Sequence, residues 1–201
     1  QTPMQRVRNA LYRYPAISPA IVLVVAVIIF GIINPRFLAP ANLSLITQQV
    51  AVIGTLGVAQ TLVILTAGID LSVGAAMILS SVVMGNAAAG LGVPGPLALI
   101  VGLIAGVLTG LVNGLLVTRL NLPPFIVTLG TLSIFTALLL LLSNGATVQG
   151  SDLPEILTFT GTTFHIGVDV TFGVFLMIVV YAAMSYALGR TAWGRHVYAV
   201  G

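Results

Sequence analysis

The sequence predicts an all-α membrane protein, a polytopic bundle of about six transmembrane helices. Charged residues make up 5% of the 201 residues, and hydrophobic residues make up 58%. A soluble protein of this length needs more charge to keep its surface hydrated. The apolar runs are continuous over roughly 20 residues and do not alternate, which favours helices over a β-barrel. We therefore expect a single transmembrane domain over residues 1–201.

Each predicted span is an apolar run long enough to cross a bilayer. The segments between the runs hold most of the charged and turn-forming residues. The predicted spans are residues 17–33, 43–65, 71–89, 97–118, 125–142 and 170–188. The last two are separated by a long polar segment, residues 143–169, and a loop of this length usually has a function or short structure of its own.

The arginines predict the orientation of these spans. A cytoplasmic N-terminus leaves only Arg36 outside and places the other arginines inside: Arg6, Arg8, Arg13, Arg119, Arg190 and Arg195. An excess of basic residues in cytoplasmic loops is the usual pattern of membrane proteins. We therefore expect a cytoplasmic N-terminus. We also expect a cytoplasmic surface formed by Arg190, Arg195 and His196, with membrane lipid head groups as its first candidate partner.

A short joint between the second and third spans contains Gly68, Asp70, Ser72 and Gly74. Asp70 is the only acidic residue before position 152, and a carboxylate between two membrane helices is costly in lipid. Two placements remain open. The joint is either a turn at the inner membrane surface, which the arginines favour, or a helix break within the membrane. In a surface turn, Gly68 would end one helix and Asp70 would cap the next.

The fourth span carries small residues at the spacing that is typical of close helix packing in membranes. The predicted helix-packing glycines recur every four residues: Gly102, Gly106, Gly110 and Gly114. Thr109 and Asn113 project from the same face. Packing explains the glycines well, whereas an amide inside a bilayer needs a hydrogen-bond partner.

Neutral polar side chains within the spans are candidates for the lining of a substrate pathway. They offer hydrogen-bond donors and acceptors without fixed charge, which suits an uncharged sugar. The alternative is that they bond to neighbouring helices or to their own helix backbone. The candidates are Gln48, Thr55, Gln60, Asn113, Thr128 and Thr131.

The sequence predicts no enzymatic centre. It has no cysteine, and its seven basic residues are all arginine, which excludes a P-loop and a Schiff-base lysine. Neither His165 nor His196 lies in a zinc-binding motif. We therefore expect no catalytic residue, no metal, no cofactor and no nucleic-acid partner. We also expect that this chain does not hydrolyse ATP itself.

The sequence resembles the permease subunits of bacterial ABC importers for monosaccharides, the ribose and fructose permeases in particular. The motifs that carry the resemblance occur in order along almost the whole chain, at residues 61–74, 113–118, 123–131 and 194–201. The resemblance implies a homodimeric permease in the bacterial inner membrane. Its implied partners are a cytoplasmic ATP-binding subunit, which uses the ATP, and a periplasmic sugar-binding protein. It also implies that the family fold continues beyond residue 201.

Two other functions remain open at this point. One is a secondary transporter or facilitator for a small neutral solute that uses the same polar side chains. The other is a membrane scaffold whose glycine faces assemble a complex. Association with an ATPase subunit distinguishes the ABC permease from both. Uptake that persists when ATP hydrolysis is blocked favours the facilitator.

Overall fold

The computed structural model describes residues 16–201. Arg6, Arg8, Arg13 and the predicted cytoplasmic N-terminus lie outside the described residues. These residues form two compact units. The first contains residues 16–46 and 165–169, and the second contains residues 47–164 and 170–201.

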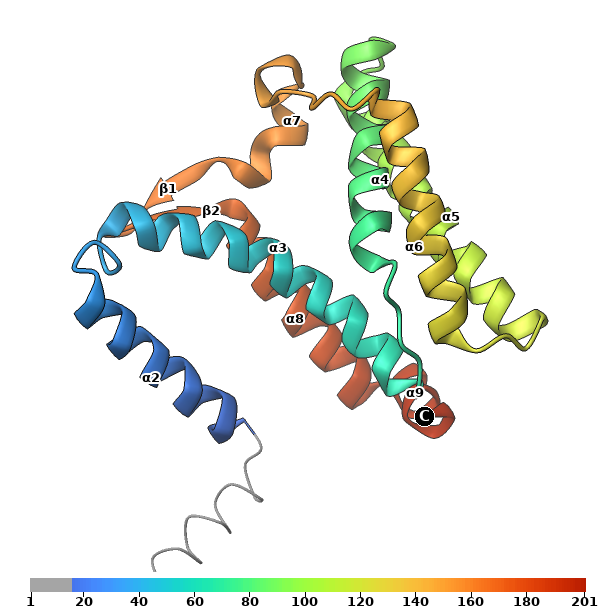
Figure 1. The fold of residues 1–201 in the computed structure, drawn as a ribbon, viewed down its shortest axis with the longest axis horizontal. Helices are drawn as coiled ribbons and strands as arrows, with labels where there is room; N and C mark the ends of the chain where they lie inside the picture. Colours follow the sequence, from blue (N-terminus) through green and yellow to red (C-terminus); the bar gives the residue numbers. More distant parts are fainter. Residues whose placement is uncertain (1–15) are drawn as a thin grey trace, which may run out of the picture. The chain divides into compact units, whose positions relative to one another are not determined.

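The described chain is mainly helical, which confirms the predicted all-α class (Figure 1). The helices are α2 (Ile17–Ile33), α3 (Pro40–Leu65), α4 (Val73–Gly85), α5 (Gly95–Arg119), α6 (Pro124–Ser143), α7 (Glu155–Thr158), α8 (Phe172–Arg190) and α9 (Ala192–Val200). A π-helical turn, Asn86–Gly90, extends α4. Five helical segments are long and apolar enough to cross a membrane: α3, α4 with its π-helical turn, α5, α6 and α8. The shorter apolar helix α2 has 17 residues, at the lower end of the length that a span needs. The apolar helices lie where the hydropathy predicts them.

Three of the long helices have a proline in their first turn. Helices α3 and α6 begin at Pro40 and Pro124, and α5 has Pro96 in its first turn. Proline suits these positions because the first N–H groups of a helix have no intrahelical acceptor. Helix α9 is not among the predicted elements. Its nine residues follow α8 after Thr191.

The long segment before α8 has short structure of its own, as its length predicts. It contains two 3₁₀ turns (Gly150–Asp152 and Phe159–Gly161), α7, and the paired strands β1 (Thr163–His165) and β2 (Asp169–Thr171). The ring of Phe172 stacks on Phe159 with centroids 4.7 Å apart and lies 5.0 Å from Phe164. These aromatic contacts fix the segment to the start of α8.

In the first unit, α2 and the start of α3 are joined by a tight turn. The rings of Phe30 and Phe37 have centroids 5.6 Å apart. The Asn42 side-chain amide donates to the Phe37 carbonyl at 2.7 Å. Together these contacts close the connection between the two helices.

In the second unit, α4, α5 and α6 pack against one another. Ala75, Leu79 and Phe135 form one buried cluster. Ala87, Ala88 and Ala98 form another, in which the small side chains bring α5 close to the end of α4. The outward faces of these helices remain apolar, which is the pattern expected of helices that contact lipid or further protein.

Helices α8 and α9 meet at Thr191. Its hydroxyl donates to the Ala187 carbonyl at 2.6 Å and accepts the Gly194 N–H at 3.3 Å. Gly194 lies against the backbone of Leu188, so a Cβ there would be 2.6 Å from the Leu188 carbonyl carbon and Cα. The hydroxyl and the close backbone contact together set the turn between the two helices.

The residue after α9 lies against the end of α3. A Cβ at Gly201 would be 2.8 Å from the Leu65 carbonyl carbon and 3.2 Å from the Ala67 nitrogen. The contact is between main-chain atoms, because glycine presents no side chain and the nearest atoms of its neighbours belong to the backbone.

Candidate functional site

The joint between α3 and α4 begins with a left-handed residue. Ala67 has φ +57°, and its N–H donates to the Ile64 carbonyl at 2.9 Å. The Gly68 N–H donates to the Val63 carbonyl at 2.9 Å, so two of the last carbonyls of α3 are satisfied. Gly68 is not the left-handed residue, contrary to the usual preference for glycine. It is required because a Cβ there would be 2.9 Å from Val63 Cγ1 and 3.1 Å from the Val63 oxygen.

Asp70 holds the residue that precedes α4. One carboxylate oxygen, Oδ1, accepts both the backbone N–H and the hydroxyl of Ser72, each at 2.7 Å. Ser72 is the N-cap of α4 and is fully buried. The Ser72 side chain makes no cap bond to α4; the Asp70 carboxylate instead accepts the N–H two positions ahead, at the start of the helix. At Gly74 a Cβ would meet no atom within 4 Å.

Helices α5 and α6 both bond to this joint. Asn113 on α5 is 8% exposed, and its Nδ2 donates to Ser72 Oγ at 2.7 Å. Thr128 on α6 is 3% exposed. Its hydroxyl lies 3.2 Å from the Ile69 carbonyl and 2.9 Å from the Pro124 carbonyl of its own helix. The structure thus brings two candidate pathway residues together with Asp70 and Ser72.

The other candidate pathway residues have more local contacts. Thr131 is buried, and its hydroxyl donates to the Thr128 carbonyl at 3.3 Å. Thr55 donates to the Ala51 carbonyl at 2.8 Å, one turn earlier on α3. Gln48 and Gln60 are half-buried on the same helix. Self-bonded hydroxyls of this kind are common in membrane helices.

Two buried side-chain oxygen atoms of residues 16–201 lack a hydrogen-bond partner within the chain. They are Gln60 Oε1 and Asn113 Oδ1. A buried polar atom without a partner costs free energy, so such atoms are rare in folded proteins. Both atoms belong to residues that the sequence proposes for the pathway, and both are hydrogen-bond acceptors.

The glycines of α5 separate into two pairs. A Cβ at Gly102 would be 2.8 Å from Met84 Cβ, and one at Gly106 would be 3.2 Å from Ser80 Oγ, so these two glycines pack on α4. At Gly110 and Gly114 a Cβ would meet no atom within 4 Å. Four residues exceed one helical turn by about 40°, so the row of glycines rotates away from α4 along the helix.

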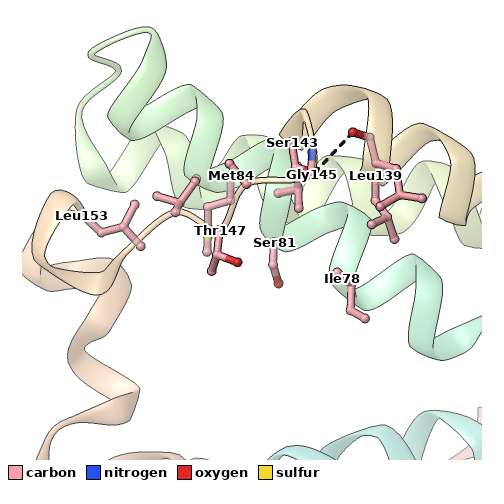
Figure 2. Close-up of a pocket in the computed structure, with 13 residues that line it drawn as sticks. Ile78, Ser81, Met84, Leu139, Ser143, Gly145, Thr147 and Leu153 are labelled. Carbon is pink, nitrogen blue, oxygen red and sulfur yellow. Dashed lines mark hydrogen bonds between the residues drawn. The ribbon is translucent and has the colours of Figure 1, made fainter.

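A cavity of about 430 Å³ lies between α4, the end of α6 and the loop that follows it (Figure 2). Most side chains around it are apolar, including Ile78, Met84 and Leu153. The hydroxyls of Ser81 and Ser143 are directed to helix carbonyls, those of Met77 and Leu140. None of the candidate pathway residues lines this cavity, so it does not coincide with the polar joint.

The basic residues near the end of the chain are exposed. Arg190, Arg195 and His196 are all accessible, and His196 Nδ1 lies 2.9 Å from the Ala192 carbonyl oxygen. His165 Nδ1 lies 2.9 Å from Asp169 Oδ1, and no arginine in the described part of the chain forms an ion pair. The arginines are therefore accessible to partners outside this chain.

Replacement of Asp70 by alanine is expected to destabilise the protein. The change removes two hydrogen bonds to Ser72, and each is worth about 1.5–3 kcal/mol because the acceptor is charged. The melting temperature of the purified full-length protein measures the effect. The matched control is Asp152→Ala, because the Asp152 side chain is exposed at the end of a 3₁₀ turn and accepts only a 3.4 Å contact from Ser151. Equal melting temperatures for the two variants would contradict the structural role of Asp70.

The sequence was compared with known proteins. Residues 42–201 match the family described as "Branched-chain amino acid transport system / permease component". The chain is 49% identical over 206 residues to a fructose import permease protein of Rhizobium meliloti, covering 100% of this chain and 57% of the relative. It is 38% identical over 185 residues to a ribose import permease protein of Bacillus subtilis, covering 92% and 56%.

A third relative is an autoinducer 2 import system permease protein of Yersinia pestis. It is 34% identical over 176 residues, which cover 86% of this chain and 48% of the relative. The chain thus spans about half the length of the curated relatives it matches. No solved structure matches the sequence. The chain belongs to the branched-chain amino acid transport system / permease component family, and it is a multi-pass protein of the bacterial inner membrane.

Proposed function

We propose that this chain is part of the membrane-spanning permease of an ATP-driven importer that carries a monosaccharide into the cytoplasm. The observation that carries the proposal is the pair of unpaired amide oxygens, Gln60 Oε1 and Asn113 Oδ1. Each is an acceptor that a sugar hydroxyl satisfies. Both atoms are buried in this structure, so a hydroxyl reaches them only after neighbouring helices move, as transport requires.

The polar chemistry of the spans supports a sugar over an amino acid. An amino acid carries a carboxylate and an ammonium group, and both need charged or dipolar partners inside a membrane. The candidate pathway residues are uncharged, and Asp70 already accepts two hydrogen bonds from Ser72. The fructose and ribose import permeases among the relatives support the same substrate class.

The proposal includes the partners that such an importer needs. The chain holds no phosphate-binding loop, so a cytoplasmic ATP-binding subunit would bind and hydrolyse the ATP, and the permease itself needs no cofactor. A periplasmic binding protein would deliver the sugar, and a second permease copy would complete the pore. The exposed Arg190, Arg195 and His196 would face lipid head groups or the ATP-binding subunit.

Uptake by the reconstituted importer tests this function. The full-length permease, its ATP-binding subunit and its binding protein are placed in proteoliposomes. Labelled fructose, ribose and leucine are then supplied, with and without ATP. We expect ATP-dependent uptake of one of the monosaccharides and none of leucine. The matched control is an ATP-binding subunit that lacks its P-loop lysine, which should abolish the signal.

Three results would overturn the proposal. Uptake of leucine in preference to the sugars would assign the substrate class of the family description instead. Sugar uptake that persists without ATP hydrolysis would identify a facilitator. Failure of an ATP-binding subunit to co-purify with the full-length permease would favour a non-transporting scaffold.

A further inference from the structure

We infer that Asn113 and Ser72 are positioning residues, linked with Asp70 in a hydrogen-bond chain of fixed direction that locks α5 to the joint between α3 and α4. The chain runs from Asn113 Nδ2 to Ser72 Oγ and from Ser72 Oγ to Asp70 Oδ1, with both distances 2.7 Å. The two ends of this chain are about forty residues apart in the sequence. It therefore joins helices that local structure does not hold together.

The direction of the chain follows from the number of protons. An ionised carboxylate only accepts hydrogen bonds, so Asp70 requires the single hydroxyl proton of Ser72. Ser72 Oγ then has only lone pairs to offer to Asn113. The amide of Asn113 must present Nδ2 to it, because the opposite orientation would place two acceptors 2.7 Å apart. Asp70 thus fixes which way the Asn113 amide points.

The same argument explains the unpaired oxygen of Asn113. Once Nδ2 is directed at Ser72, the geometry of the amide directs Oδ1 away, and no donor in the described residues reaches it. Nine-tenths of the Asn113 side chain is buried, so the amide has little freedom to rotate. The orientation that leaves Oδ1 unsatisfied is retained because the charge of Asp70 requires it.

Helices α4 and α6, which pack against α5, contain no titratable side chain, and the only one on α5 is Arg119, exposed at its last residue. Helix α7, which packs on α5 as well, carries the exposed Glu155, and α9, whose end lies against α3, carries the exposed Arg195 and His196. Within the described residues, Asp70 is therefore the ionisable group that is hydrogen-bonded to this pair through Ser72. A change of the donor at position 113 should consequently be readable as a pH effect.

Two replacements of Asn113 separate donation from packing. In Asn113→Asp, the introduced acid has nearly the shape of the amide. Its neutral form donates to Ser72, whereas its ionised form cannot donate and is repelled by Asp70. In Asn113→Leu, a side chain of similar size donates at no pH. Both are made in the full-length permease, with Gln149→Glu as an exposed control for an added acid.

Thermal melting at pH 5 and pH 8 gives the readout. We expect the melting deficit of Asn113→Asp, relative to the unmodified protein, to grow by roughly 2–8 °C between pH 5 and pH 8, because the neutral, donating form of the acid becomes rarer as the pH rises. Asn113→Leu should melt lower by the same amount at both pH values, and Gln149→Glu should match the unmodified protein at both. The inference is wrong if the deficit of Asn113→Asp does not change with pH, or if Asn113→Leu melts like the unmodified protein.

A double variant tests whether Ser72 and Asn113 act through one bond. If they do, Ser72→Ala combined with Asn113→Leu lowers the melting temperature no further than the larger single change. Additive shifts would contradict a shared bond. Melting requires no substrate, so this result stands apart from the uptake experiment, and either can fail without the other.

Discussion

Gly194→Ala is expected to disrupt the junction between α8 and α9. The new Cβ would lie 2.6 Å from the Leu188 carbonyl carbon and Cα. These are main-chain atoms, which cannot move aside as the end of a flexible side chain can. Overpacking of this kind costs about 1–3 kcal/mol and sometimes more. We expect a lower melting temperature and faster cleavage by trypsin at Arg190 and Arg195, which flank the junction.

The matched control for this prediction is Gly189→Ala, five residues earlier. Gly189 lies within α8, and a Cβ there would meet no atom within 4 Å. Alanine has a higher helix propensity than glycine. This variant should therefore melt at or above the temperature of the unmodified permease. Equal rates of cleavage in the two variants would show that the contact with Leu188 does not hold the junction.

The second large effect is expected at Gly102, where α5 is closest to α4. A Cβ there would be 2.8 Å from Met84 Cβ and 3.3 Å from the Ser80 carbonyl oxygen. Gly102→Ala should force the two helices apart and destabilise the bundle by about 1–3 kcal/mol. Gly110→Ala, on the same helix, adds its methyl group to open space within this chain. Melting temperatures of the two full-length variants provide the comparison.

The melting temperature of Gly110→Ala also tests whether Gly110 contacts another part of the assembled permease. If Gly110→Ala melts as low as Gly102→Ala, then Gly110 packs against a part of the assembled permease outside this chain. If neither variant is destabilised, the close approach of α4 and α5 is wrong. The two glycines are eight residues apart, so both replacements carry the same gain in helix propensity.

The transmembrane helices were predictable because an apolar run of sufficient length has few other stable structures in a membrane. Helix α9 was not predicted because it has no such apolar run. Its nine residues mix Arg195 and His196 with Trp193 and Tyr198, so no long apolar run reveals it. Its start depends on the Thr191 hydroxyl and on the contact of Gly194 with Leu188, and the second of these is a spatial contact that composition does not encode.

The polar joint was predictable in its parts but not in its connections. Asp70 and Asn113 each stand out in the sequence as groups that need a partner in lipid. Ser72, which connects them, belongs to the joint that the sequence singles out, but its bond to Asn113 depends on how α4 and α5 pack. The left-handed conformation of Ala67 was not predictable either, because Gly68 is the residue that usually adopts it.

The sequence also did not predict which of the α5 glycines contact α4. Their spacing of four residues is visible in the sequence, and so is the rotation of about 40° per step that follows from helix geometry. What the sequence does not give is the width of the contact with α4. The glycine contact includes Gly102 and Gly106 and ends before Gly110, although Asn113, further along α5, bonds to Ser72 at the start of α4.

The contact of Gly201 with Leu65 and Ala67 has a mechanical consequence. Side chains in an interface can change rotamer and so absorb a displacement of a fraction of an ångström. Here main-chain atoms meet main-chain atoms, and nothing between them can yield in that way. An added side chain at position 201 would therefore displace the main chain that leads into Asp70, because the peptide groups that it meets have no rotamer to change.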